Sequence, residues 1–196
     1  MSTKKDEISY DLNSTMKDAR HRYFMANGFG EDGGYSKSVE WVKIGFVKLP
    51  VLNTEGRKHA VRFHDFHHIL TGYHTDWPGE CEIAGWEIGA GCGTAWVAWF
   101  LNLSAYSVGV FALPKRTFKA FVRGRNSNNL YQYHHDDLIG RTVAEVREIT
   151  GVDEACDQAG LGDVVAFFAW GFVAISMALG QLAVPVVAIL FLIGRM

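Results

Sequence analysis

Charged residues are spread unevenly along this chain, and two long runs contain none. The first run extends from Ile88 to Pro114 over 27 residues, and the second from Val164 to Gly194 over 31 residues. Several Gly and polar side chains interrupt the first run, which favours buried helices, or the wall of an apolar pocket, over a membrane span. The second run has only Ser176 and Gln181 as strongly polar side chains, which indicates a membrane helix.

The second run is long enough to act as an anchor. The 20 residues from Val164 to Ala183 can cross about 30 Å of hydrocarbon. Pro185 is expected to kink or break the helix, so we predict one transmembrane helix with a bent end, or alternatively a re-entrant hairpin. Only Arg195 of the 19 Lys and Arg residues follows the run, which favours a cytoplasmic location for the preceding domain.

Apolar spacing and turn residues predict further helices before these runs. A short apolar-rich segment at 39–47 predicts a helix that ends before Pro50. A helix is also expected over 57–70, ended by Gly72. The turn Trp77-Pro78-Gly79 would precede another helix, which begins near Glu80.

Two more helices are predicted after the first uncharged run. Residues 115–125 have a basic side and an apolar side, typical of a surface helix or of a helix near anionic headgroups or a carboxylate substrate. A helix over 138–150 would be capped by Asp136 or Asp137. The fold class is therefore all-α, with a polar segment at 1–20, a helical metal-binding domain at 21–160 and a hydrophobic anchor at 164–194.

Composition excludes some classes of protein. Lys and Arg number 19 against 21 Asp and Glu, so no strongly basic surface is expected and nucleic acid is a poor candidate partner. The three cysteines are scattered without a C-x-x-C pair, which fits a reducing compartment better than a disulfide framework. A chain of 196 residues is normally one domain, or one domain with an appendage.

The densest group of metal-binding side chains lies in residues 62–80. Four His, two Asp and one Glu occur within these 19 residues, and His64, Asp65, His68 and Glu80 form the pattern H-D-x-x-H-x11-E. Histidines four residues apart lie on one side of a helix, and the turn before Glu80 can return a carboxylate to them. Asp65 could reach the metal or orient a histidine. Such ligands suit zinc, iron or manganese.

Other interpretations of these residues remain open. Two histidines at this spacing also occur in ordinary helices, and Glu80 could simply complement a helix N-terminus. Glu87 shares the helix face of Glu80 and could be a catalytic acid or base, a residue that orients a ligand, or a surface residue. His67 and His74 are less suitable as ligands. The glutamate of H-E-x-x-H is missing, which argues against a peptidase.

The pattern H-D-x-x-H-x11-E resembles the ubiquinone (coenzyme Q) biosynthesis protein Coq-four family. The segment 121–131 (Phe-Val-Arg-Gly-Arg-Asn-Ser-Asn-Asn-Leu-Tyr), Glu145-Val-Arg147 and Gly151-Val152 are also similar to the C-terminal region of that family. The resemblance covers about residues 20–153. It implies a helical fold that holds a divalent metal, usually zinc, beside an apolar groove, with His64, Asp65, His68 and Glu80 as ligands.

The family is similar to enzymes that replace the ring C1 carboxylate of a polyprenylated 4-hydroxybenzoate precursor by hydroxyl. The expected activity is that of a metal-dependent carbon–carbon lyase (decarboxylase), with Glu87 as a catalytic residue and Arg123 or Arg125 binding the carboxylate. The alternative is a non-catalytic isoprenoid- or quinone-binding membrane protein that acts as a scaffold or accessory subunit. Expected partners are membrane lipid or the prenylated precursor, and other quinone-biosynthesis proteins or a membrane complex. The expected location is the bacterial cytoplasmic membrane, or the mitochondrial inner membrane in a eukaryote.

Overall fold

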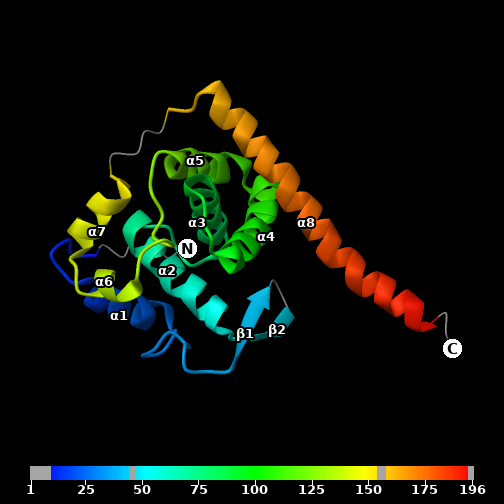
Figure 1. Cartoon of the computed structure of the whole chain (residues 1–196), viewed down its shortest axis with the longest axis horizontal. Helices are drawn as coiled ribbons and strands as arrows, with labels where there is room; N and C mark the ends of the chain where they lie inside the picture. Colours follow the sequence, from blue (N-terminus) through cyan, green and yellow to red (C-terminus); the bar gives the residue numbers. More distant parts are fainter. Residues whose placement is uncertain (1–9, 45–46, 154–157, 194–196) are drawn as a thin grey trace, which may run out of the picture.

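Helices dominate the structure, a computed structural model that describes residues 10–44, 47–153 and 158–193 (Figure 1). A two-stranded hairpin is the only sheet in these ranges. The elements are α1 (Met16–Asn27), β1 (Val39–Ile44), β2 (Val47–Leu52), α2 (Glu55–Thr71), α3 (Trp77–Ala90), α4 (Trp96–Ala112), α5 (Pro114–Arg125), α6 (His135–Ile139), α7 (Val143–Thr150) and α8 (Leu161–Ile193).

Helix α3 lies at the centre, with α2, α4 and α5 around it (Figure 1). The α3–α5 pair is the closest, because glycines remove the side chains between the two backbones. A Cβ atom on Gly89 would lie 2.2 Å from the carbonyl oxygen of Phe121, and one on Gly124 would lie 2.1 Å from that of Trp86. Any larger residue at either position would force the two helices apart. This packing fixes α3, which carries half of the candidate site.

The segment expected to form a helix over 39–47 is instead the antiparallel hairpin β1–β2. β-Branched and aromatic residues are frequent in these strands, and they favour extended backbone over helix. Pro50 lies within β2, opposite Trp41. A proline is tolerated there because each strand of a two-stranded sheet is an edge strand.

Local capping explains two further differences from the sequence prediction. The predicted helix over 138–150 is divided into α6 and α7, because Gly140 ends the first and Thr142 caps the second. The Thr142 hydroxyl accepts the Glu145 N–H at 3.2 Å, and the Glu145 carboxylate accepts the Thr142 N–H at 2.7 Å. Helix α1 begins at Met16, which is fully buried, so the core reaches into the segment assigned to a polar lead-in.

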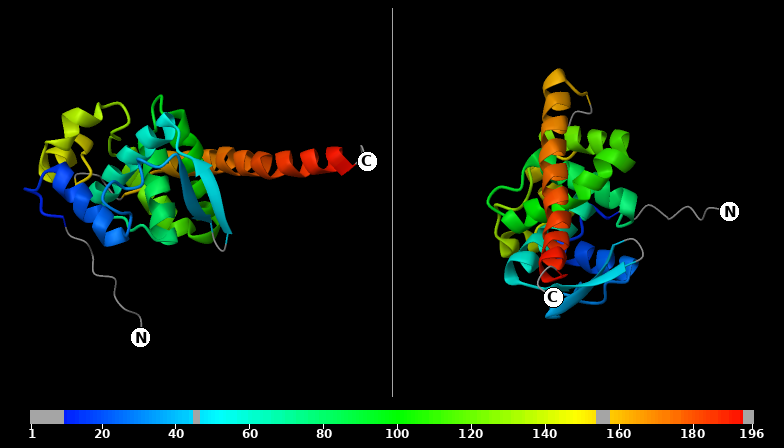
Figure 2. Two further views of the ribbon diagram at one scale, coloured as in Figure 1. Left: turned by 90° about the horizontal axis from the view of Figure 1, so that it is seen from below. Right: turned by 90° about the vertical axis from the view of Figure 1, so that its right-hand side faces the viewer.

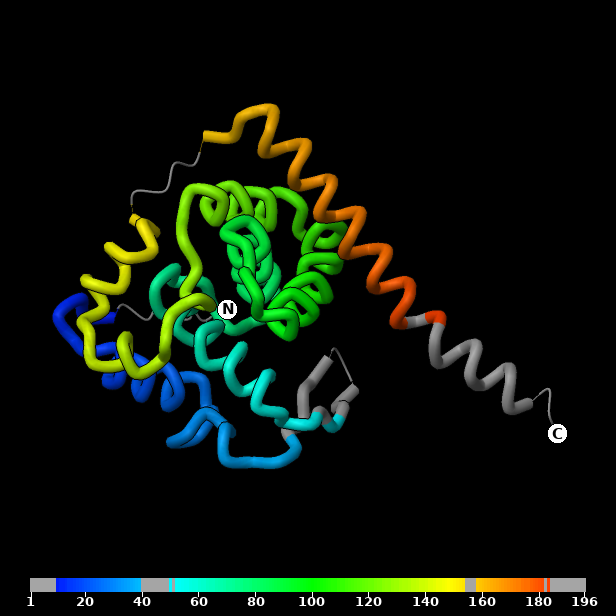
Figure 3. The backbone as a smooth tube through the Cα atoms, in the orientation of Figure 1, coloured from blue at the N-terminus to red at the C-terminus, as the bar shows by residue number. Residues whose placement is uncertain are grey.

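Helix α8 continues through Pro185 without a break, so the re-entrant hairpin is not formed. Figure 2 shows the helix extending from the body of the molecule as one rod, and Figure 3 shows its first half beside the body. One stripe of its first half packs on α4 and α5 through Phe167 and Ala174. The opposite side exposes Phe168 (64%) and Phe172 (74%). By length and composition, α8 could cross a membrane.

Candidate metal centre

The end of α2 and the start of α3 are held side by side by two helix caps. Gly72 ends α2 in the left-handed conformation (φ 76°), which glycine adopts without strain. The Asp76 side chain then accepts the Gly79 N–H at 3.0 Å and caps α3. The reversal between them brings Glu80, in the first turn of α3, next to the histidines of α2. The sequence placed this turn at Trp77-Pro78-Gly79, but these residues form the start of α3, and the reversal lies at residues 72–76.

Three side chains that could bind a metal converge at this junction: His64, His68 and Glu80. Their donor atoms are nearly equidistant. The two histidine Nε2 atoms lie 3.1 Å apart, His64 Nε2 lies 3.4 Å from Glu80 Oε2, and His68 Nε2 lies 3.5 Å from Glu80 Oε1. Tetrahedral zinc with bonds of about 2.0–2.1 Å would separate its ligands by about 3.3 Å. Spacings close to this value bring the three groups within reach of one metal ion, and the two Glu80 distances involve its two different carboxylate oxygens.

Hydrogen bonds on the far side of each imidazole determine which nitrogen faces the centre. The Nδ1 of His68 lies 2.9 Å from the Tyr73 carbonyl oxygen, and the Nδ1 of His64 lies 2.9 Å from Glu87 Oε1. Both partners are acceptors, so each Nδ1 must carry the hydrogen. Whenever both rings are neutral, the Nε2 lone pairs consequently lie next to the Glu80 carboxylate. Three lone-pair donors repel one another unless a cation or a proton lies between them, which is the arrangement of a metal site.

The pKa of His64 is raised and that of Glu80 is lowered, and both changes indicate that the centre favours positive charge. Burial by itself lowers the pKa of His64, but the carboxylates of Glu87 and Glu80 raise it well above its usual range. Burial raises the pKa of Glu80, but hydrogen bonds from His64 and His68 hold it well below its ordinary value. A divalent cation would take the place of the shared proton and neutralise the two carboxylates.

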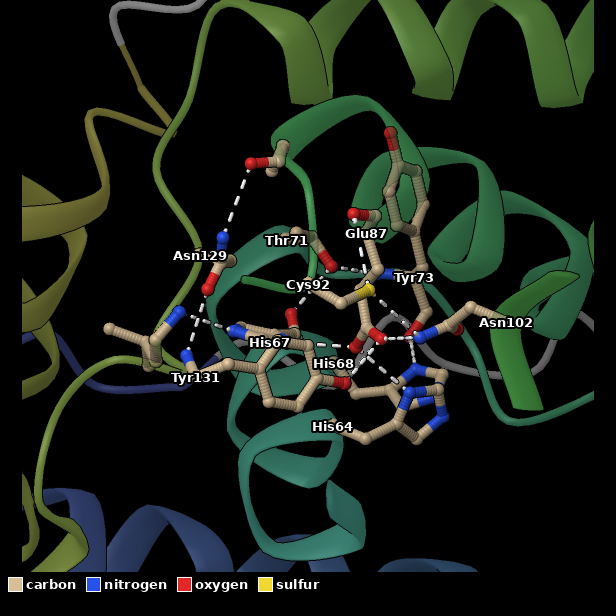
Figure 4. Close-up of polar contacts among 12 residues, drawn as sticks. His64, His67, His68, Thr71, Tyr73, Glu87, Cys92, Asn102, Asn129 and Tyr131 are labelled. Atoms are coloured by element: carbon tan, nitrogen blue, oxygen red, sulfur yellow. Dashed lines mark hydrogen bonds and ion pairs between the residues drawn. The ribbon is translucent and has the colours of Figure 1, made fainter. Parts of the chain in front are cut away.

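Glu87 is completely buried behind His64, and four donors surround its carboxylate (Figure 4). Oε1 accepts from His64 and from His67 Nδ1 at 2.8 Å, whereas Oε2 accepts from Asn102 and from the Tyr131 hydroxyl at 2.5 Å. Burial raises the pKa of Glu87, but the two histidines hold it well below its usual range. A carboxylate, an imidazole and a metal in line are typical of protein metal sites. Glu87 therefore fixes the orientation of the His64 ring, as a carboxylate behind a metal ligand would.

His67 has a structural role next to this carboxylate. Its Nδ1 donates to Glu87, and its Nε2 accepts the backbone N–H of Leu130 at 3.0 Å. Both ring nitrogens are thus occupied, which prevents the side chain from acting as a ligand. Burial lowers the pKa of His67, in agreement with a neutral ring. His67 was expected from the sequence to be less suitable as a ligand, and this arrangement supplies a physical reason.

Asp65 is not one of the converging groups, in contrast to the four-ligand set expected from the sequence. Its side chain is buried, and its carboxylate accepts the Tyr35 hydroxyl. Burial raises the pKa of Asp65, while the hydroxyls of Tyr35 and Tyr23 and the two site histidines oppose that rise. One residue along a helix is a rotation of about 100°. Asp65 therefore lies on a different side of α2 from His64.

The arginines expected to bind a substrate carboxylate have other partners. Arg123 donates to the carbonyl oxygens of Thr71 (3.0 Å) and Val152 (3.3 and 3.4 Å) and thereby ties the end of α2 to the segment after α7. Arg125 Nε lies 2.6 Å from Asp163 Oδ1 at the start of α8. Both guanidinium groups thus hold elements of the fold together. Their place in the sequence pattern could not distinguish this role from substrate binding.

Several site residues were not predicted as such from the sequence. Asn102 and Tyr131 bind Glu87 from α4 and from the segment after α5. Asn102 is the only Asn, Asp, Glu or Gln in the first uncharged run, which is the signal that could have identified it. Tyr73 accepts from His68 through its backbone carbonyl, for which the sequence offers no signal.

Solvent reaches the centre from the Glu80 side. The Glu80 side chain is 41% exposed, whereas that of His68 is buried. A cavity of about 20 Å³ adjoins His68 and is bordered by Tyr10, Tyr23 and Tyr73. A space of this size holds one water molecule. A zinc ion held by three protein ligands would leave its fourth position open, which is typical of a catalytic rather than a structural site.

Comparisons with protein-family models, with curated proteins and with solved structures find no match. The interpretation of this centre therefore depends on its own residues and geometry.

Proposed function

We propose that this protein is a metal-dependent enzyme of ubiquinone biosynthesis and that His64, His68 and Glu80 bind its metal. One observation supports the metal above all: two histidine lone pairs and a carboxylate face one another at 3.1–3.5 Å, with both outer nitrogens already bonded. Zinc is the first candidate, and iron or manganese suits the same donors. The resemblance of the H-D-x-x-H-x11-E pattern to the Coq-four family supports the pathway.

The proposed reaction removes the ring C1 carboxylate of a polyprenylated 4-hydroxybenzoate precursor and places a hydroxyl there. Exchange of carboxylate for hydroxyl is a two-electron oxidation that releases carbon dioxide, so the reaction also consumes an oxidant, of which dioxygen is the simplest. A bound metal would supply Lewis acidity toward the carboxylate and phenolic oxygens. Zinc has no redox chemistry, whereas iron and manganese do, so the identity of the metal bears directly on the oxidation.

The roles of the protein side chains follow from their contacts. Glu87 holds the His64 ring in place, and Asn102 and Tyr131 hold Glu87. All four contacts of Glu87 are internal, so we assign it as a positioning residue instead of a proton carrier. We assign Arg123 and Arg125 to the stability of the fold. A substrate would reach the centre from the side on which Glu80 is exposed.

A membrane location accords with the length and composition of α8. We propose that the domain lies on the cytoplasmic face, because the Lys and Arg residues, apart from Arg195, precede the uncharged run. A prenylated aromatic acid is itself confined to a bilayer, so the enzyme and its substrate would share one compartment. Other quinone-biosynthesis proteins would then be its neighbours.

A second function is favoured by a separate observation. The outward sides of α4 and α8 are apolar and exposed, as expected of a subunit or scaffold that binds isoprenoid lipid or membrane partners. The cavity of about 20 Å³ beside His68 is also too small for an aromatic ring. In this alternative the metal stabilises the junction of α2 and α3, and the protein has no turnover.

A matched pair of variants on one helix tests the proposal. Glu80→Gln alters a ligand, whereas Glu82→Gln alters a carboxylate that pairs with Arg116 at the surface. Purified full-length protein is analysed for bound metal by mass spectrometry and for conversion of a prenylated 4-hydroxybenzoate-type acid in the presence of dioxygen. We expect wild type and Glu82→Gln to bind one metal ion and release carbon dioxide, and Glu80→Gln to do neither.

The possible failures are distinguishable. Equal metal content in Glu80→Gln and wild type would refute the metal centre. Stoichiometric metal with no conversion, in protein that remains folded and bound to lipid, would refute the enzyme and support the non-catalytic alternative.

A further inference from the structure

The outward side of α4 is as apolar as that of α8. Helix α4 has no charged residue, and its inner side carries Ala98, Asn102 and Tyr106 into the core. Its other side exposes large apolar residues, among them Trp96 (75%) and Phe111 (71%). We call the following set the outer apolar face: Trp96, Phe100, Leu101, Val108 and Phe111 of α4 with Val165, Phe168, Phe172, Val173 and Leu179 of α8. Exposed apolar surfaces on adjacent elements mark an interaction site.

Helix α8 packs against the domain and is not joined to it at one end alone. Trp170 stacks on Trp99 of α4 with 4.8 Å between ring centroids. The Tyr106 hydroxyl donates to the Phe167 carbonyl oxygen at 3.1 Å. The contact between the two helices extends to Gln181, whose amide donates to the Ser104 hydroxyl at 3.4 Å. For more than half of its length, α8 therefore lies against α4 (Figure 1).

The part of the uncharged run beyond this contact is too short to cross a bilayer. Only residues 182–194 separate Gln181 from Arg195. As a helix they would extend about 20 Å, against about 30 Å of hydrocarbon. A membrane span must therefore include the part of α8 that packs on α4. A helix that lay along the membrane surface would bring the same part of α4 to the lipid.

Charged residues mark the limits of this apolar surface. Lys115 and Arg116 are exposed immediately after α4 ends. The ion pair between Arg125 and Asp163 lies where the uncharged part of α8 begins. Cations at the border of an apolar surface are typical of a membrane interface, where they meet anionic headgroups. A protein partner would not require charge to be absent from α4 and from the part of α8 that follows Asp163.

We propose that the acyl chains of a lipid bilayer cover the outer apolar face, so that the metal-bearing domain is seated in the membrane through α4 as well as α8. This inference needs neither the metal nor the reaction. It has one consequence for the site: the inner side of α4 carries Asn102, which donates to Glu87. One helix, about 10 Å thick, thus separates lipid from the carboxylate that orients His64.

Fluorescence quenching of the full-length chain in phospholipid vesicles tests this placement. Single cysteines replace Phe100 or Val108 on α4, Phe172 on α8 and Glu148 on α7 in a Cys156→Ser background, and each is labelled with an environment-sensitive dye. The native Cys81 and Cys92 are buried. Lipids with a nitroxide on the acyl chain report contact with hydrocarbon, and aqueous iodide reports contact with water. Melting by circular dichroism verifies that each labelled variant is folded.

We expect the nitroxide lipids to quench the dye at 100 and 108 as strongly as at 172, and iodide to quench only the dye at 148. Strong nitroxide quenching at 172 with iodide quenching at both α4 positions would overturn the proposal, because it would show a domain tethered in water. Protection of the α4 positions from both quenchers, together with crosslinking to a second chain, would also overturn it and would identify a protein partner.

Discussion

Replacement of Glu87 by glutamine removes one charge from the buried network and nearly preserves its shape. The amide oxygen can still accept from His64 and His67, but its NH2 group then faces Asn102 and Tyr131, which are both donors at present. The Tyr131 hydroxyl can rotate to accept, whereas an opposed pair of NH2 groups remains at Asn102. At least one hydrogen bond to a charged group is lost, and the other bonds lose their charge assistance.

The expected losses of stability and of metal affinity follow from the loss of this hydrogen bond and of the charge. One hydrogen bond to a charged group contributes about 1.5–3 kcal/mol to the free energy of unfolding. Loss of a carboxylate that orients a metal-binding histidine lowers metal affinity by about 10- to 100-fold. At a fixed metal concentration well above the dissociation constant, Glu87→Gln should therefore lose about 1.4–2.7 kcal/mol of metal-dependent stabilisation beyond the direct cost.

Competition with a zinc chelator gives the dissociation constant, and urea unfolding with and without metal gives the linked stability. Glu82→Gln, the same change on the same helix, is the control. Its two-point pair with Arg116 is half exposed on the arginine side, so its contribution is on the order of 1 kcal/mol. The reasoning is refuted if Glu87→Gln binds zinc as tightly as Glu82→Gln. If Glu87→Gln does not fold, Tyr131→Phe removes a single donor from the same carboxylate and is expected to weaken zinc in the same direction.

Three further results are expected. Asp65→Asn should retain one bound metal ion per chain whereas His68→Ala should not, because Asp65 binds Tyr35 and is not one of the three converging side chains. Metal analysis of both variants checks this. Loss of metal in Asp65→Asn would instead support the four-ligand site expected from the sequence. Gly124→Ala should lower stability by about 1–3 kcal/mol or more through its clash with α3, whereas Gly140→Ala, with open space around it, should melt close to wild type. Acidification should release the metal as protons compete for His64, whose pKa lies well above its usual range, so the dissociation constant measured in buffered zinc should begin to rise at a pH above the ordinary histidine range and keep rising as the pH falls.

The predicted elements agree with the structure where a local rule determines them. The α2 boundary at Gly72 depends on a left-handed glycine. Helix α3 begins at Trp77, three residues before the start predicted near Glu80, because Pro78 is tolerated in the first turn and Asp76 caps the helix. The helix predicted over 39–47 was wrong, because a short apolar segment fits either a helix or a strand. Antiparallel pairing of β1 with β2, which extends to Leu52, determined that the segment is extended. The boundary between α6 and α7 was also missed, because the Thr142 capping box competed with the aspartates chosen as caps.

The sequence by itself determined the candidate metal ligands on α2 and α3. Four-residue spacing aligns His64 with His68 on any helix, and a short turn returns Glu80 to the same end, so the convergence needs only local geometry. The long uncharged run likewise identified α8 as a candidate membrane helix.

Tertiary structure alone decided what surrounds those ligands. Glu87 orients His64 because Asn102 and Tyr131, 15 and 44 residues further along the chain, are packed against it. Packing likewise turned Asp65 toward Tyr35 and laid α8 along α4. Such contacts depend on how distant helices pack, and residue spacing within one helix carries no information about them.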